Sequence, residues 1–120
     1  MDNTEYKYKI AVASSDGKVV NQHFGRAEEF FIIGVDEQNQ TYYLERRRVN
    51  PICEQGNHED GRLEVAIKTL IDCRYVLVSR VGESAASRMK RLGVVPMELP
   101  GLIEDSIQQL IIYEELQQLF

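Results

Sequence analysis

The chain has 120 residues, of which 43% are hydrophobic and 28% are charged, with a formal net charge of −5 at pH 7. This length and composition are typical of one water-soluble globular domain with its own core. The negative charge argues against nucleic acid as the main ligand, and no apolar run approaches the ~20 residues that span a membrane. Because the polar start of the chain, MDNTEYKYK, does not resemble a signal peptide, we expect a cytoplasmic protein.

The first part of the chain predicts three strands separated by polar turns. Short apolar or alternating runs place these strands at Lys9–Ser14, Glu29–Val35 and Thr41–Val49. Asp16-Gly17, after the first strand, has the composition of a hairpin turn. We therefore expect the domain to open with a three-stranded meander.

The spacing of apolar residues then changes to the helical pattern of i, i+3 and i+4. It predicts helices at Asp60–Asp72, Ser84–Leu92 and Ile103–Leu119. The residues that this spacing places on the inward faces are Leu63, Ala66, Ile67, Leu70, Ile71, Ala85, Met89, Leu92, Ile103, Ile107, Leu110 and Ile111. Apolar runs between these helices predict further strands, which are Arg74–Arg80 and a last one that begins at Val94. Gly93 has the position of a helix stop.

The expected order is β-β-β-α-β-α-β-α, whose alternating second half implies parallel strands joined by helical crossovers. The fold class is therefore α/β, with one domain built on a mixed five-stranded sheet. We expect this domain to cover residues 9–120 and residues 1–8 to form a flexible N-terminus.

This topology predicts where a ligand binds. If the strand at 74–80 runs parallel to the first strand, the loops at 14–26, 50–60 and 80–84 leave the same sheet edge. Ligands of open α/β sheets bind at that edge, outside the carboxyl ends of the strands. The three loops hold both histidines and one of the two cysteines, and their candidate residues are His23, Arg26, Cys53, His58, Arg80 and Gly82.

His23-Phe24-Gly25 stands in the first of these loops, within NQHFGRAEEFFII. An imidazole can ligate a metal, act as a base near neutral pH or simply hydrogen-bond within a loop. We expect Phe24 to anchor the loop in the core and Gly25 to allow a tight turn beside a ligand. The sequence alone leaves a ligand role and an ordinary loop histidine both open.

The second loop, PICEQGNHED, contains Cys53 and His58 in a C-x₄-H arrangement. Thiolate and imidazole both ligate transition metals, and His23 would raise the number of ligands to three. Structural zinc takes four ligands, so the pattern fits an open metal site or a loosely held cluster better. An exposed thiol and a helix-capping histidine are the alternative, and we interpret Cys73 as a core residue.

Three further features have competing structural explanations. The backbone around Gly82 can receive an anion at a helix start, although a plain strand-to-helix turn explains it as well. The three arginines at 46–48 must point to alternate faces and guard an edge strand, or else attract an anionic ligand or acidic partner. Asp16 is the one well-placed carboxylate, whereas a two-metal hydrolase needs several.

Three segments together resemble the dinitrogenase iron–molybdenum cofactor-binding domain family, which includes NifX- and NafY-like proteins and the C-terminal domain of NifB-like proteins. They are KIAVASSDGKVVNQHFGRAEEFFI, RRVNPICEQGNHEDGRLE and LIDCRYVLVSRVG. The resemblance covers nearly the whole chain, from about residue 9 to about residue 119. It implies a small α/β domain with a ribonuclease H-like motif.

The resemblance implies binding rather than catalysis, so we do not expect an enzyme. Family members resemble carriers of the iron–molybdenum cofactor, or of its iron–sulfur precursor, during nitrogenase cofactor assembly. The histidine of the HFG motif carries over to His23 and the cysteine after the third strand to Cys53, whereas many relatives have a further cysteine where this chain has His58. An anionic cluster would also be favoured by positive potential from Arg26 and Arg80 and by the backbone of Gly25 and Gly82.

Two other functions stay open. The apolar residues of the last helix spread beyond one stripe, which suits a protein-interaction or regulatory domain, with a nitrogenase assembly protein or a second copy in a homodimer as partner. These residues are Ile111, Ile112, Leu116, Leu119 and Phe120. A metal-dependent hydrolase is suggested by the ribonuclease H-like motif and opposed by the scarcity of carboxylates.

Overall fold

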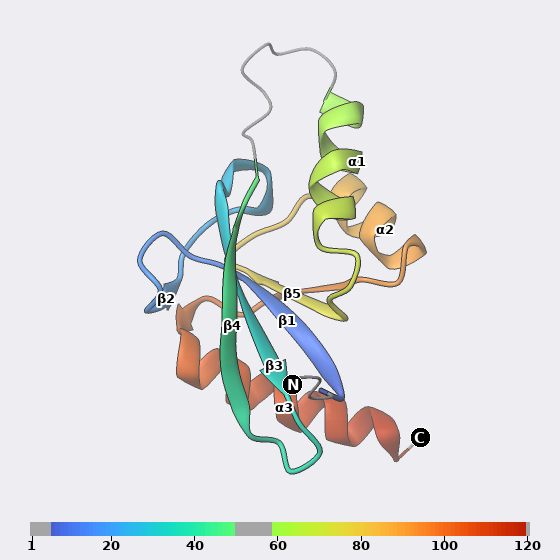
Figure 1. Ribbon diagram of the computed structural model, residues 1–120. Coiled ribbons are helices and arrows are strands. Elements are labelled where there is room, and N and C mark those ends of the chain that lie inside the picture. The colour runs from blue at the N-terminus through green and yellow to red at the C-terminus, as the bar shows by residue number, and fades with distance from the viewer. Residues whose placement is uncertain (1–5, 50–58, 120) are drawn as a thin grey trace.

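The computed structural model describes residues 6–49 and 59–119, which form a sheet with helices on both faces (Figure 1). The sheet strands are β1 (Tyr8–Ala13), β3 (Glu29–Val35), β4 (Thr41–Arg48), β5 (Tyr75–Val78) and β6 (Val95–Glu98). The helices are α1 (Glu59–Thr69), α2 (Glu83–Arg91) and α3 (Ile103–Gln118), with a short 3-10 helix, η1 (Phe24–Arg26). A separate two-stranded ribbon pairs β2 (Val19–Val20) with β7 (Gly101–Leu102).

The main sheet has the strand order β4-β3-β1-β5-β6. β1 pairs antiparallel with β3 and parallel with β5, while β4 pairs antiparallel with β3 and β6 parallel with β5. The α/β class, the mixed five-stranded sheet and the order β-β-β-α-β-α-β-α of its strands and helices are thus confirmed. The ribbon of β2 and β7 was not predicted, because each of its strands has only two residues.

The prediction of a hairpin turn at Asp16-Gly17 is wrong. The turn leads from β1 into β2, which pairs with β7 from the far end of the chain and not with β1. Gly17 does need its glycine, because its φ is +77° and an added Cβ would lie 3.3 Å from the ring of Phe31. The prediction of a tight turn with glycine at this position is therefore correct, whereas the strand that follows the turn pairs with a distant part of the chain.

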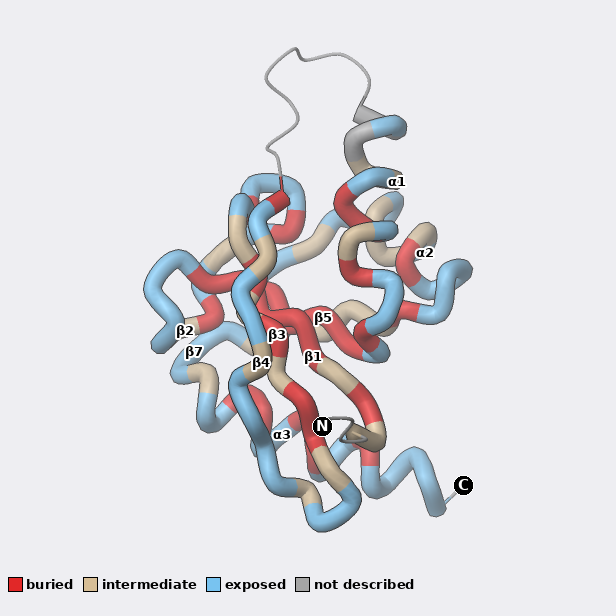
Figure 2. The backbone as a smooth tube through the Cα atoms, viewed as in Figure 1, coloured by how far each residue is buried: buried red, intermediate tan, exposed pale blue. Residues whose placement is uncertain are grey.

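β1 and β5 are the central buried strands: β5 is buried throughout and β1 at every residue except Lys9, as Figure 2 shows by colour. Alternate residues point to opposite faces of a strand. Ala11 and Ala13 accordingly pack in the core shared with α1 and α2, while Ile10 and Val12 pack in the core under α3. Small side chains on one face of β1 and larger ones on the other thus meet two different helical layers.

The helices confirm most of the predicted apolar faces. Ala66, Ile67, Leu70 and Met89 are buried on the α1 and α2 side, and Ile107, Leu110 and Ile111 are buried beneath α3. Ile71 and Leu92, which the periodicity placed inside, are instead 48% and 39% exposed. Both follow the last residue of their helix, where the chain leaves the helical path, and Gly93 then completes the predicted stop with a φ of +87°.

Three residues at the start of the described chain make defined contacts. The backbone N–H of Lys7 donates to the carbonyl of Val35 at 2.7 Å, and Tyr8 begins β1. The Tyr6 ring lies over Gly34, where an added Cβ would approach it to 2.7 Å. The prediction of a flexible N-terminus at residues 1–8 otherwise falls on residues 1–5, outside the described part.

The arginines of β4 point to alternate faces, as predicted, and β4 is an edge strand. Arg47 donates to both carboxylate oxygens of Asp72, at 2.8 and 2.9 Å, and to the carbonyl of Thr69 at 2.8 Å. The guanidinium of Arg47 holds the pKa of Asp72 well below its usual range. This side chain therefore joins the edge strand to the end of α1 by charge-assisted hydrogen bonds, which are stronger than neutral ones.

A buried carboxylate on α3 anchors that helix to β5. Glu114 is 5% exposed and accepts hydrogen bonds from the hydroxyl of Tyr75, from Arg74 at 2.7 Å and from Gln118 at 2.9 Å. Burial alone would raise the pKa of Glu114, but the hydrogen bonds from Tyr75 and Arg74 outweigh it and lower the pKa. Ionised Glu114 therefore belongs to the folded state.

None of the helices in residues 6–49 and 59–119 is long and apolar enough to cross a membrane.

We expect Glu114→Gln to lower the free energy of unfolding by about 1–3 kcal/mol near neutral pH, because it removes a charged acceptor from the buried Tyr75 hydroxyl and from Arg74. Since the folded pKa of Glu114 is depressed, its contribution is present above the ordinary glutamate pKa of 4.5 and is lost as the pH falls through the folded value. Urea unfolding at several pH values checks this, with the exposed Glu104→Gln as control. A difference from wild type that grew towards acid pH would contradict it.

Candidate functional site

The loop that carries His23 lies alongside the end of β5. The N–H of Phe24 donates to the carbonyl of Arg80 at 2.9 Å, and the N–H of Ser79 donates to the carbonyl of Gln22 at 3.0 Å. His23 and Arg80 form an isolated parallel bridge between these two bonds. The loops after β1 and β5 thus share one sheet edge, as the topology predicted, whereas residues 50–58 of the loop after β4 lie outside the described part.

His23 is exposed and stands just before η1. Its carbonyl accepts a hydrogen bond from the N–H of Arg26 at 3.0 Å. The next residue, Phe24, is 4% exposed and packs against Phe30 with ring centroids 5.9 Å apart, which confirms the predicted anchor. The imidazole is therefore presented to solvent from a backbone that is fixed on both sides.

The start of this loop is held by the side chain of Asn21, which the sequence did not single out, and by that of Asp16. The side-chain oxygen of Asn21 accepts from the N–H of Ser15, and its side-chain nitrogen donates to the hydroxyl of Ser15, both at 3.0 Å. Asp16 accepts from the N–H groups of Lys18 and Val19 at 2.9 and 3.1 Å, and these bonds lower the pKa of Asp16. The Asp16 carboxylate therefore organises the turn, which removes the reason to assign it to hydrolysis.

A polar pocket of about 370 Å³ opens beside the loop. It is lined by Ser14, Ser15, Gln22, Arg26, Glu28 and Glu29. Hydroxyl, amide and guanidinium groups can hydrogen-bond the polar part of a ligand, while the carboxylates of Glu28 and Glu29 repel any negatively charged part of a ligand at their side of the pocket. Arg26 is the predicted residue that the structure places in this pocket.

Arg80 and Gly82 lie at the same edge, at the start of α2, and both are exposed. The N–H of Val81 already donates to the carboxylate of Glu98 at 2.9 Å. An anion at this helix start must therefore coexist with an internal carboxylate, which weakens the anion site expected from the backbone around Gly82. Added Cβ atoms at Gly25 and Gly82 would meet nothing within 4 Å, so neither glycine is required by close packing.

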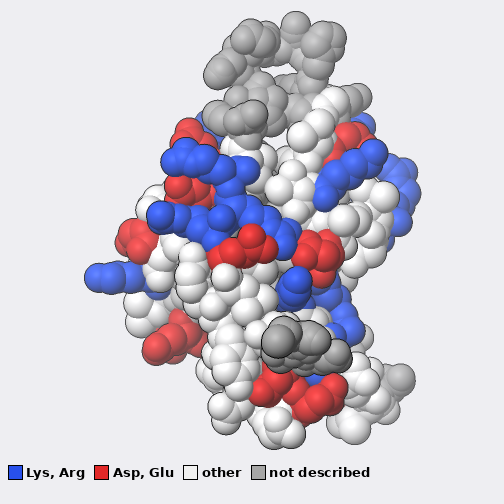
Figure 3. Space-filling model, in the orientation of Figure 1, with Lys and Arg blue, Asp and Glu red and all other residues white. Residues whose placement is uncertain are grey.

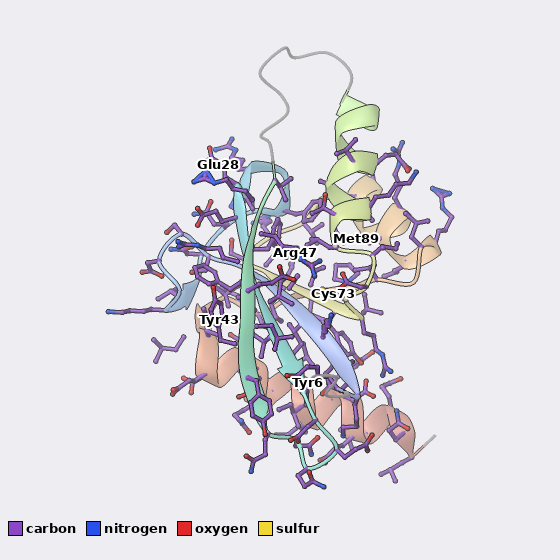
Figure 4. The ribbon with its side chains drawn as sticks, viewed as in Figure 1. Tyr6, Glu28, Tyr43, Arg47, Cys73 and Met89 are labelled. Atoms are coloured by element: carbon purple, nitrogen blue, oxygen red, sulfur yellow. The ribbon has the colours of Figure 1, made fainter. Side chains whose placement is uncertain are left out.

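Cys73 does not belong to this edge. It is 1% exposed, packs in the core beneath α1 and lies near Arg47 (Figure 4). Burial, with the nearby charge of Asp72, raises the pKa of the Cys73 thiol to about 12. The interpretation of Cys73 as a core residue is confirmed.

The described residues bring His23, Gly25, Arg26, Arg80 and Gly82 to one edge of the sheet. Among residues 6–49 and 59–119, no three His, Cys, Asp or Glu side chains form a group that could hold a metal ion. The other two predicted ligands, Cys53 and His58, lie outside the described residues. His23 is thus the one predicted metal ligand whose surroundings the structure gives.

We expect Cys73 to be unreactive towards a disulfide reagent in the folded protein, because its thiol is buried and protonated. A Cys53→Ser variant leaves Cys73 as the one thiol, and the thiolate released from Ellman's reagent reports its reaction. The same variant in concentrated urea should react at once. Reaction of the folded protein at the rate of a free cysteine would contradict the buried placement.

We expect Asn21→Ala to loosen the His23 loop without unfolding the domain, at a cost of about 1 kcal/mol, because two hydrogen bonds to Ser15 are lost. Hydrogen exchange should become faster at the amides of Ser15 and of the loop up to Phe24, while β1 stays protected. Asn21→Asp keeps the acceptor and loses the donor, so its effect should be smaller. Equal exchange in all three proteins would show that this contact does not hold the loop.

The chain is similar in sequence to a known protein family and to named proteins of it. The family described as dinitrogenase iron-molybdenum cofactor matches residues 6–112. The FeMo cofactor biosynthesis protein NifB of Chlorobaculum tepidum is 34% identical over 96% of this chain, and protein NifY of Klebsiella pneumoniae is 34% identical over 73% of it. The chain spans 26% of that NifB and 36% of that NifY.

Solved structures show the same fold. The crystal structure of PH0822 has a TM-score of 0.64 at 22% identity and covers 86% of this chain and 89% of its own. The NMR structure of TM1290 from Thermotoga has a TM-score of 0.52 at 22% identity and covers 86% of each chain. With the match over residues 6–112, these findings show that the chain belongs to the dinitrogenase iron-molybdenum cofactor family.

Proposed function

We propose that this domain binds and carries an iron–sulfur-type metallocluster, the iron–molybdenum cofactor or a precursor of it, in nitrogenase cofactor assembly or a related role. The observation that carries the proposal is the exposed imidazole of His23 on a loop whose backbone is bonded on both sides to neighbouring elements. Family membership supports the kind of cargo. The domain on this view holds its cargo and does not transform it.

The chemistry of the edge suits a cargo that must later be released. Imidazole and thiolate ligate iron at a cluster surface, and a small number of ligands leaves the remaining positions to a receiving protein. His23 would supply one bond, while Arg26 and Arg80 would attract an anionic cluster through charge-assisted contacts. Cys53 and His58 are proposed as further ligands from the neighbouring loop.

The partners follow from this role. A carrier exchanges its cluster with the proteins that build and receive it, so nitrogenase assembly proteins are the expected partners. Relatives such as NifB are much longer than this chain, and the activity of their remaining parts is not attributed to it. No observation favours a hydrolase, because the Asp16 carboxylate is engaged in its own turn.

We expect His23→Ala to weaken cluster binding by about tenfold or more, because loss of a ligand or its support has effects of this size at metal sites. The protein is loaded anaerobically with isolated iron–molybdenum cofactor, or with iron and sulfide, and visible absorption is followed through gel filtration. Gln40→Ala, in the turn at the opposite sheet edge, is the matched control and should bind like wild type.

Cys53→Ala should weaken binding as well, and the double variant with His23→Ala should abolish it. Unchanged binding in both single variants would overturn the proposed site. Absence of binding by the wild-type protein to either form of cluster would overturn the proposed function itself.

A further inference from the structure

The face of the sheet that carries α3 is only partly covered. The buried side chains of α3 pack with those of β1 and β5, so the helix lies over that side of the sheet. Over β3 and β4, next to the start of α3, there is a pocket of about 460 Å³. Its apolar lining comes from Val12, Phe31, Ile33, Tyr43 and Ile103, and Arg46 forms its polar side.

This pocket has the composition of a binding surface. Tyr43 is one of the lining residues and is 60% exposed, and Figure 4 shows it on the edge strand β4. Exposed tyrosine and arginine beside aliphatic side chains are enriched at protein interfaces.

The rim of the pocket is positively charged. Arg46 lies 5.6 Å from the centre of the Phe31 ring and 3.6 Å from Glu29, and Arg48 shares the same carboxylate at 3.2 Å. The Arg46 and Arg48 side chains are 57% and 74% exposed. One carboxylate thus serves two guanidinium groups, and Figure 3 shows Lys and Arg gathered over the side of the molecule where β4 runs, with Asp and Glu among them.

The complementary surface is on the outer side of α3. Ile112, Leu116 and Leu119 are 58%, 49% and 74% exposed, and their spacing of four and three residues puts them on one face of the helix. The exposed Glu115 lies beside this stripe, where its carboxylate also accepts a hydrogen bond from the side chain of Asn39 at 2.6 Å. The outer side of α3 near its end is therefore apolar with one carboxylate beside it, and the pocket is apolar with one guanidinium at its side.

We propose that a second copy of this chain occupies the pocket, with Leu116 and Leu119 of one copy against Tyr43 of the other and Glu115 next to Arg46. The stripe lies in the last turns of α3 and the pocket lies beside its first turn. Two α3 helices in antiparallel orientation therefore satisfy both contacts about one two-fold axis and form a closed dimer. This inference does not depend on cluster binding, because none of these residues belongs to the His23 loop.

The test is the association state of the full chain, measured by sedimentation velocity from low to high micromolar concentration. We expect a concentration-dependent dimer. Arg46→Glu and Leu116→Glu should each raise its dissociation constant by about tenfold or more, as expected for residues at the centre of an interface. Ile71→Glu, which puts the same charge on an exposed apolar residue at the end of α1, should leave dimerisation unchanged.

Combining Arg46→Glu with Glu115→Arg restores the charge pairing and should recover much of the association lost in Arg46→Glu alone. Circular dichroism checks that each variant is folded, and Leu116→Ser replaces Leu116→Glu if the acidic variant is not. A protein that stays monomeric over the whole range would overturn the proposal. A dimer that neither Arg46→Glu nor Leu116→Glu weakens would overturn it as well.

Discussion

The parallel pairing of β1 with β5 is the contact on which the rest of the molecule depends. Ile10, Ala11 and Val12 lie opposite Tyr75, Val76 and Leu77, and nearly all of these side chains are fully removed from water. Parallel strands require a crossover connection, and here the chain runs through β3, β4 and α1 between β1 and β5. Because the two strands run the same way, their carboxyl ends meet at one edge, and the loops after them become neighbours.

That pairing continues beyond the sheet and builds the site. The bonds from Phe24 to Arg80 and from Ser79 to Gln22 have the parallel pattern and directly follow the end of β5, with the His23 loop in the place of β1 as partner. Phe24 then closes the loop by entering the core. His23 is held between a buried neighbour and a bonded backbone, so its position is set by the sheet although its side chain is in water.

The sequence predicted the fold well because the period of its apolar residues matches the structure of each element. Glu29–Val35 was predicted at its observed bounds, and the other elements within a few residues. Two predictions failed because their determinants leave no periodic signal in the sequence. The partner of β2 is distant in the chain, and the exposure of Ile71 depends on where α1 ends.

The site was predictable in part for the same reason. His23, Arg26 and Arg80 could be placed at one edge because topology alone determines which loops meet there. The role of Asn21 was missed, because its hydrogen bonds to Ser15 depend on how the loop folds back on itself, which the sequence pattern does not indicate. The bond from Val81 to Glu98 also escaped prediction, since it joins the start of α2 to the end of β6 and changes the anion-binding character of that helix start.

The two sheet faces differ in a way that fits a carrier domain. On the α1 and α2 side the core is closed, and Arg47 fastens even the edge strand to the end of α1. On the other side Glu114 fixes α3 over β5, which leaves part of the sheet around Phe31 and Tyr43 open. The closed face includes Phe24, which together with the backbone bonds to Ser79 and Arg80 fixes the His23 loop, and a loop that is already ordered lowers the entropy cost of binding. On the proposed carrier function, release of the cluster would be governed by the number of its bonds to the protein and not by refolding of the domain.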